Sequence, residues 1–214
     1  MGTSTAMRMA SAALVAALVL VSGCDGAAVR PAPTAAEPSE VAQPQLTADA
    51  TLPSASADDV WVPVVDEPTG VTVQMPGEAT SEALEAPDGA GGTVPLRSYI
   101  ASAGERQHAV SFSVTDIPPG QEAVAPEDRL EPSLQGAAAN TGATIESQST
   151  ASAGAYPALD GVLIFTQGGT AGVSLMRVAA TDTAVVIVQT VGRASDRAEL
   201  ETLQQRLASS LVIP

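Results

Sequence analysis

The chain has 214 residues, with 24 acidic and nine basic side chains, and its formal net charge is −15 at pH 7. All nine basic residues are arginines, and there is one cysteine and one histidine. This balance excludes nucleic acid as an expected partner, because an acidic surface repels phosphate backbones. Without lysine or a Cys/His cluster the sequence offers no Walker loop, Schiff base or common zinc site, so we expect no cofactor and no metal.

Residues 1–23 have the organisation of a bacterial secretory signal. Arg8 provides the positive n-region, and an apolar run follows from Ala10 to Val21. This run is shorter than the roughly 20 apolar residues that a helix needs to cross a bilayer. Small residues at its end complete the pattern of an export signal that is removed from the mature protein.

The end of this signal, Val21-Ser22-Gly23-Cys24, resembles the lipobox of bacterial lipoproteins. In that family, signal peptidase II recognises the residues before the cysteine and cuts the chain there. The resemblance implies that Cys24 carries an S-diacylglyceryl group and that its amino group is open to N-acylation. The cell membrane is then a partner through this lipid, on its extracytoplasmic face, because two or three acyl chains hold a protein firmly. The alternative is a buried apolar cysteine in an anchor that is not cleaved.

Residues 24–59 contain five prolines, no aromatic residue, and six acidic residues against one arginine. Such a segment cannot bury enough apolar surface to offset its ordering entropy, so we predict a disordered tether. As a coil its ends lie ~30 Å apart on average, and its stretched limit is roughly 110 Å. The alternative is an irregular arm packed on the domain. Cleavage would leave eight arginines and all 24 acidic residues, and no basic patch for anionic lipids.

Residues 60–214 are predicted to form a single domain that opens with strands. The β-branched segment 60–65 is expected at an edge, because Pro63 cannot donate to a central ladder. The run 184–191 is apolar on both faces, as is typical of a central strand. Between them, alternation and turn residues predict strands at 70–77, 79–86, 93–101, 107–115, 143–149, 159–165 and 173–180, with turns at 87–92, 155–157, 168–172 and 181–183.

Two helices are expected, one midway and one at the end. The first runs from Pro126 to Asn140, or begins at Pro132 with proline in the first turn, and Gly142 is its expected stop. In the second, Asp196 and Glu199 are read as a capping pair. Its leucines share one face, at positions 200, 203, 207 and 211.

The fold class is therefore α+β, an antiparallel β-sheet flanked by two helices. This layout resembles the PsbP-like α/β/α sandwich, to which lipoproteins of the LpqN type are similar. The segments that carry the likeness are Val71–Gly77, Tyr156–Gly161 and the closing leucine helix. The resemblance implies an envelope accessory or ligand-binding module and supplies no catalytic residues.

Few side chains are candidates for chemistry. His108 is interpreted as a structural histidine on the apolar face of its strand, with catalysis as the alternative. Arg97 and Arg177 are expected to be solvated or ion-paired, with a clamp on an anionic ligand as the alternative. Trp61 is expected to anchor the core, although it could line a cleft. Ser174 follows Gly172 as in a nucleophile elbow, but the second glycine and the following helix are absent. Turn chemistry accounts for four aspartates, Asp88, Asp116, Asp160 and Asp182.

We therefore expect a membrane-anchored envelope lipoprotein that is a binding or accessory module for an envelope protein or an apolar ligand, and not an enzyme. The alternative is an envelope hydrolase that uses a serine or paired carboxylates. That alternative requires a pocket where such groups converge with shifted pKa values. A purely structural lipoprotein is the third possibility.

Overall fold

The computed structural model describes residues 60–87, 92–104, 108–118 and 120–214. The signal, the predicted tether, Asp88 and the lipobox residues Val21, Ser22, Gly23 and Cys24 lie outside the described residues. None of the helices in the described ranges is long and apolar enough to cross a membrane.

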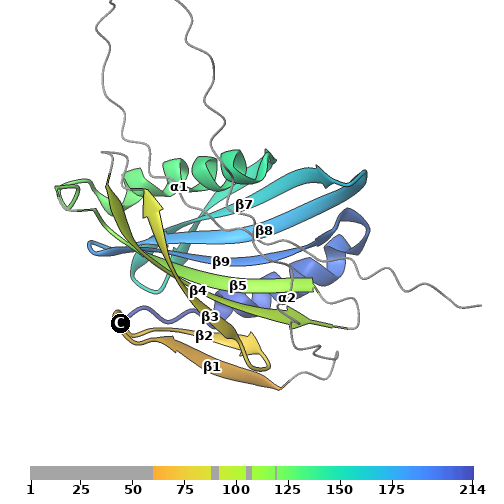
Figure 1. Cartoon of the computed structure of the whole chain (residues 1–214), viewed down its shortest axis with the longest axis horizontal. Coiled ribbons are helices and arrows are strands. Elements are labelled where there is room, and N and C mark those ends of the chain that lie inside the picture. Colours follow the sequence, from red (N-terminus) through yellow and green to blue (C-terminus); the bar gives the residue numbers. More distant parts are fainter. Residues whose placement is uncertain (1–59, 88–91, 105–107, 119) are drawn as a thin grey trace, which may run out of the picture.

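The described residues form two antiparallel sheets and two α-helices (Figure 1). Strands β1 (Trp61–Asp66) and β2 (Val71–Pro76) form a hairpin of their own. The other sheet has the order β3-β4-β5-β9-β8-β7-β6, and its strands are β3 Thr80–Pro87, β4 Thr93–Ala103, β5 His108–Asp116, β6 Thr144–Ala153, β7 Tyr156–Gln167, β8 Thr170–Ala180 and β9 Ala184–Arg193. Helix α1 (Pro126–Thr141) joins β5 to β6, and α2 (Arg197–Ser209) follows β9. The predicted α+β class, an antiparallel sheet with two helices, is confirmed.

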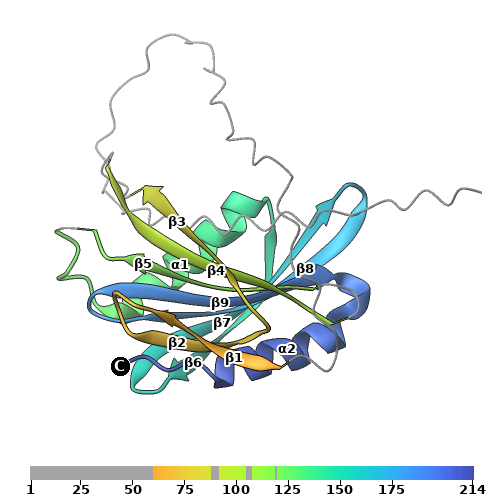
Figure 2. The ribbon, with the colours of Figure 1, turned by 60° about the horizontal axis from the view of Figure 1, so that its bottom comes forward.

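Strand β9 is the fourth of seven and, as predicted, is buried on both faces. Val186 packs in one apolar cluster with Leu207 of α2, while Ile187 packs in another with Leu134 of α1. Successive side chains of a strand point to opposite faces, so the two helices contact different faces of the sheet. Figures 1 and 2 accordingly draw α1 above and α2 below β9.

The β1–β2 hairpin lies on the same side of the sheet as α2. Val73 and Met75 belong to one cluster with Phe112 of β5 and Leu207 of α2. A bridge between Thr72 and Val212 also ties the hairpin to the segment after α2. The hairpin therefore covers the part of this face that α2 leaves over β4 and β5. The sequence predicted these strands but not their separation from the main sheet.

The bounds of α1 are close to those predicted. The helix begins at Pro126, as expected, so the alternative start at Pro132 is wrong and Pro132 lies inside the helix. Leu130 and Leu134, on either side of Pro132, are buried against the sheet and hold both halves in place. The helix ends as predicted at Gly142, which takes a left-handed conformation with φ of 63°.

The predicted capping pair of α2 is wrong. Asp196 occupies the N-cap position but makes no side-chain cap hydrogen bond. Its Oδ1 accepts a bond from Ser195 Oγ at 3.0 Å. Glu199 is directed at His108 of β5 and so does not return to the helix start. Of the predicted leucine stripe, Leu200 and Leu207 are fully covered, Leu203 is partly buried, and Leu211 is buried just beyond the end of the helix.

Two turns are tighter than expected. The β6–β7 turn consists of Gly154 and Ala155, and Tyr156 already belongs to β7. The β7–β8 turn is the pair Gly168-Gly169, both with positive φ, which a two-residue hairpin turn requires. The predicted hairpin is correct there, but its turn is shorter than the predicted 168–172. Strands β7 and β8 are correspondingly longer than predicted.

Gly161 marks the closest approach of α1 to β7. A Cβ at this position would overlap the methyl groups of Leu134, whose side chain is fully buried. We predict that Gly161→Ala lowers the free energy of unfolding by about 1–3 kcal/mol, because the packed core gives Leu134 no room to move. Urea denaturation measures the change. The penalty should shrink in a Leu134→Ala background, and equal penalties in the two backgrounds would contradict this explanation.

Candidate functional site

One end of the domain carries a cluster of ionisable groups built around Asp66, the last residue of β1. Asp66 is fully buried, and its Oδ1 lies 2.7 Å from Nε of Arg97 on β4. The same guanidinium binds Asp116 of β5 through Nη2 to Oδ1 at 2.7 Å and Nη1 to Oδ2 at 3.3 Å. Arg97 thus joins the hairpin to two strands of the main sheet.

Two hydroxyl groups complete the shell of Asp66. Thr69 donates to Oδ2 at 2.6 Å, and Tyr99 donates to Oδ1 at 2.9 Å. The ring of Tyr99 stacks on Phe112 with centroids 4.3 Å apart, which fixes the phenol over the core. Both oxygens of the buried carboxylate therefore accept hydrogen bonds, as a buried charge requires.

These contacts shift the ionisation of the cluster. Burial favours protonation of Asp66, but the bonds from Arg97, Thr69 and Tyr99 outweigh it and hold the pKa below its ordinary value. Burial and the bond to Asp66 raise the pKa of Tyr99 to about 12. Bonding to Asp116, and then to Asp66, raises the pKa of Arg97. Asp66 and Arg97 therefore stay charged at neutral pH and form a partly buried ion pair.

A pocket of about 230 Å³ lies beside this cluster. Its walls come from the β1–β2 turn, the β6–β7 turn, the β8–β9 turn and the last residues of the chain, and its lining is Thr69, Val71, Tyr156, Thr181, Asp182, Thr183, Ala184, Ile213 and Pro214. Thr69 therefore faces both Asp66 and the pocket. The mixture of hydroxyls, one carboxylate and a few apolar groups suits a single polar or amphipathic side chain better than a long apolar ligand.

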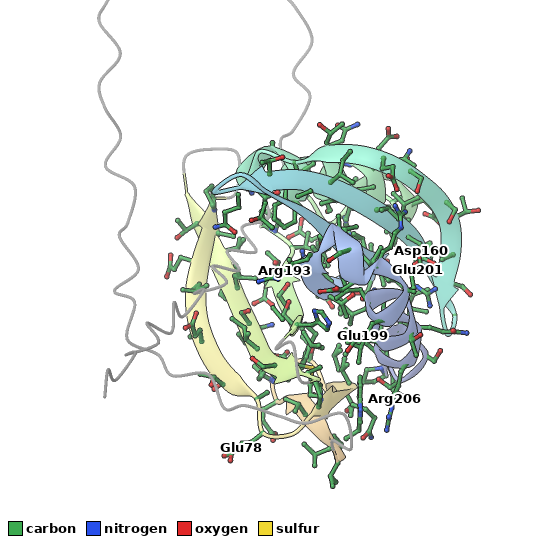
Figure 3. The ribbon with its side chains drawn as sticks, turned by 90° about the vertical axis from the view of Figure 1, so that its right-hand side faces the viewer. Glu78, Asp160, Arg193, Glu199, Glu201 and Arg206 are labelled. Atoms are coloured by element: carbon green, nitrogen blue, oxygen red, sulfur yellow. The ribbon has the colours of Figure 1, made fainter. Side chains whose placement is uncertain are left out.

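The opposite end of β5 holds His108, which is 3% exposed. Its Nε2 lies 3.3 Å from Oε2 of Glu199 without hydrogen-bond geometry. Gly192 faces the other side of the ring, since a Cβ there would lie 2.7 Å from Nδ1. Figure 3 shows Glu199 on the side of α2 that faces the strands. The surroundings fit the structural role predicted for this histidine.

Arg177, the other arginine singled out by the sequence, is also paired. Arg177 binds Asp160 through Nε at 2.6 Å and Nη2 at 2.8 Å. Asp160 thus lies within β7, paired across to β8, and the prediction that it serves a turn is wrong. Both Arg97 and Arg177 are ion-paired with carboxylates, so the ion-pair interpretation describes both.

The serine of the elbow-like segment is not placed for nucleophilic attack. Ser174 is buried in β8, and its Oγ accepts a bond from Gln189 Nε2 at 2.6 Å.

Trp61 packs at the margin of the core, where Cζ of Arg206 lies 4.2 Å from its ring centre. Within the described ranges there is also no group of three or more His, Cys, Asp or Glu side chains that could hold a metal ion.

Sequence reasoning missed Asp66, Thr69 and Tyr99. The one local signal was the segment after β1, where Asp66 precedes Glu67-Pro68-Thr69-Gly70 and its carbonyl accepts bonds from the amides of Thr69 and Gly70. That pattern indicates a turn. It carries no information about Arg97, which is 31 residues away along the chain.

No family model matches the chain, and no curated protein matches it. Among solved structures, a Pseudomonas aeruginosa protein of unknown function, PA94, matches with a TM-score of 0.43 and 12% identity over 72% of this chain and 96% of that one. LpqN of Mycobacterium tuberculosis, described as involved in cell envelope biogenesis, matches with a TM-score of 0.37 and 13% identity over 73% of this chain and 92% of that one. Both scores are low, so the function proposed below rests on this chain's own residues.

We predict that Asp66→Asn lowers the free energy of unfolding at pH 7 by roughly 2 to 3 kcal/mol, because it leaves Arg97 partly buried with one carboxylate fewer. Asp66 has a lowered pKa in the folded state, so its contribution is full above the unfolded value near 4 and is lost as the pH falls through the folded value. The difference in the free energy of unfolding between the wild-type protein and Asp66→Asn should therefore decrease at acid pH. Urea denaturation at several pH values measures it.

Tyr99 gives an independent measure of the same variant. Its pKa should fall from about 12 toward the ordinary value but not reach it, because burial of the ring remains. Asp182→Asn, at an exposed position of the β8–β9 turn, is the matched control. It should leave both the free energy of unfolding and the pKa of Tyr99 unchanged. A Tyr99 pKa that stays at about 12 in Asp66→Asn would show that the carboxylate does not act on the phenol.

Proposed function

We propose that this chain is a membrane-anchored lipoprotein of the bacterial cell envelope whose domain binds a partner protein on the extracytoplasmic side. The lipobox at Val21–Cys24 supports the anchor, and the composition of residues 24–59 supports a flexible spacer. The domain belongs, in this proposal, to the PsbP-like α/β/α sandwich type. The packing of α1 and α2 against different faces of the sheet supports that assignment.

The proposed binding role rests on one observation, which is that side chains fill the space between each helix and the sheet. Leu134 and Leu163 fill the space under α1, and Phe112, Leu200 and Leu207 fill the space under α2. Each is less than 2% exposed. An acyl chain would have to displace these side chains, at the cost of the burial that stabilises the fold. This packing favours a protein partner over an apolar ligand.

The pocket beside the Asp66 cluster is the surface on which we place the partner. At about 230 Å³ it is smaller than the roughly 300 Å³ at which small-molecule sites begin. It is large enough for one anchoring side chain, and such pockets contribute much of the free energy of protein–protein binding. Thr69 in its wall donates to Asp66, which supports a preformed position for this part of the pocket. The proposal assigns the domain no reaction.

The anchor is tested by Cys24→Ser in the full chain. The variant should leave the membrane fraction and appear in the soluble extracytoplasmic fraction, because the sulfur that accepts the diacylglyceryl group is absent. Ser22→Ala keeps a small residue before the cysteine and should remain in the membrane. A Cys24→Ser protein that stays membrane-bound would contradict the anchor.

The partner site is tested by a photo-crosslinking residue at Asp182, which is exposed in the pocket wall. We expect one discrete adduct with an envelope protein in native membranes, lost when Thr183→Trp fills the pocket and absent when the probe stands at Glu78 in the β2–β3 turn. Mass spectrometry identifies the adduct. Equal adducts from Asp182 and Glu78, or a lipid that co-purifies in stoichiometric amount, would contradict a protein-binding pocket.

A further inference from the structure

Strand β6 is an outer strand of the seven-stranded sheet, and β7 is the one described strand that pairs with it (Figure 2). A free edge presents unpaired backbone N–H and C=O groups that can bind another strand. Proteins usually protect such edges with charges, prolines or bulges. The composition of each edge therefore indicates which one is open to pairing.

Two other outer strands, β1 and β3, carry this protection. Strand β1, which among the described strands pairs with β2 alone, has Pro63 at its middle. Strand β3 has Glu82 and Glu85 at exposed positions and ends on Pro87. After Glu146, in contrast, β6 consists of Ser, Gln, Thr and Ala alone, and these side chains are mostly exposed.

The acidic side chains on and beside β6, Glu146 and Asp160, form ion pairs with arginines. Glu146 stands at an irregularity of the strand, and its Oε2 lies 2.5 Å from Nη2 of Arg197 on α2. On the neighbouring β7, Asp160 is paired with Arg177. In a chain with a net charge of −15, this edge can approach a second copy without bringing unpaired carboxylates together.

The geometry of the β6–β7 hairpin identifies the backbone N–H and C=O groups of β6 that do not bond to β7. Ala153 and Tyr156 flank the two-residue turn, and such a flanking pair exchanges both backbone hydrogen bonds. The next residue, Ser152, is opposite Pro157, which has no N–H to donate. Alternation then directs the N–H and C=O groups of Gln148, Thr150 and Ser152 away from β7. The Ser152 carbonyl has one further contact, to Nη1 of Arg177 at 3.5 Å.

We propose that β6 pairs with β6 of a second copy of this chain, antiparallel, about a two-fold axis at Thr150. Thr150 then faces Thr150 of the second copy, and Gln148 faces Ser152. The pairing is self-complementary, as a two-fold interface requires, and every facing side chain is uncharged. The same arrangement at β3 would put Glu82 and Glu85 of both copies, four carboxylates, into the interface. The two seven-stranded sheets would become continuous through β6.

The interface consists mainly of backbone hydrogen bonds along one strand, which is small for a stable dimer in dilute solution. Copies confined to one membrane have a much higher effective concentration, which favours weak pairing. This step rests on the proposed Cys24 anchor, whereas the pairing itself does not. Dimers should therefore form in the membrane at ordinary expression levels and in solution only at high concentration.

The test uses a short bismaleimide crosslinker on the full chain carrying Thr150→Cys. We expect a crosslinked dimer in membranes, and none from Ala83→Cys, an exposed position on the edge strand β3. Adding Gln148→Pro to Thr150→Cys should abolish the dimer, because it removes an N–H that faces the free edge and leaves the β6–β7 bonds intact. The unfolding temperature of this variant, measured in parallel, should stay unchanged.

A second arm separates the pairing from the anchor. Thr150→Cys is placed in the soluble Cys24→Ser chain and crosslinked over a range of protein concentrations. A dimer that appears at high concentration and is lost with Gln148→Pro supports the pairing even if the chain proves not to be lipidated. Absence of the dimer in both arms, persistence with Gln148→Pro, or equal crosslinking from Ala83→Cys overturns it.

Discussion

The arrangement of this domain depends on one partly buried ion-pair network, in which Arg97 binds Asp66 and Asp116. Asp66 ends β1, at the turn of a hairpin that is not hydrogen-bonded to the main sheet as a strand. Apolar contacts alone could hold that hairpin in several positions, because burial is not directional. The guanidinium, with its fixed geometry, specifies one position. With the hairpin there, Val73 and Met75 close the core over β4 and β5.

The same network extends to the nearby pocket. Thr69 donates to Asp66 and lines the pocket, so the pocket wall and the ion pairs form one unit. The helix–sheet interfaces are filled with side chains, which leaves turns, pocket and sheet edges as the surfaces available to a partner.

Local sequence patterns anticipated most of the secondary structure, because hydrophobic periodicity and turn residues act over a few positions. The apolar run of β9 predicted a central strand, the leucines of α2 predicted a buried stripe, and Gly142 predicted the end of α1. The errors have local causes too. Tyr156 resembled a turn residue beside Pro157 but belongs to β7, and Glu199 is drawn to His108 in place of the helix start.

The sequence by itself determined the class of fold, the position of nearly every strand and the prediction of a lipid anchor at Cys24, because each depends on residue types within short windows. Only the tertiary structure decided that β1 and β2 leave the main sheet, that Arg97 is shared between Asp66 and Asp116, and that β6 is an outer strand among the described strands. These features depend on residues tens of positions apart. A carboxylate's partner is whichever cation the folded chain brings to it, and composition alone does not specify which one.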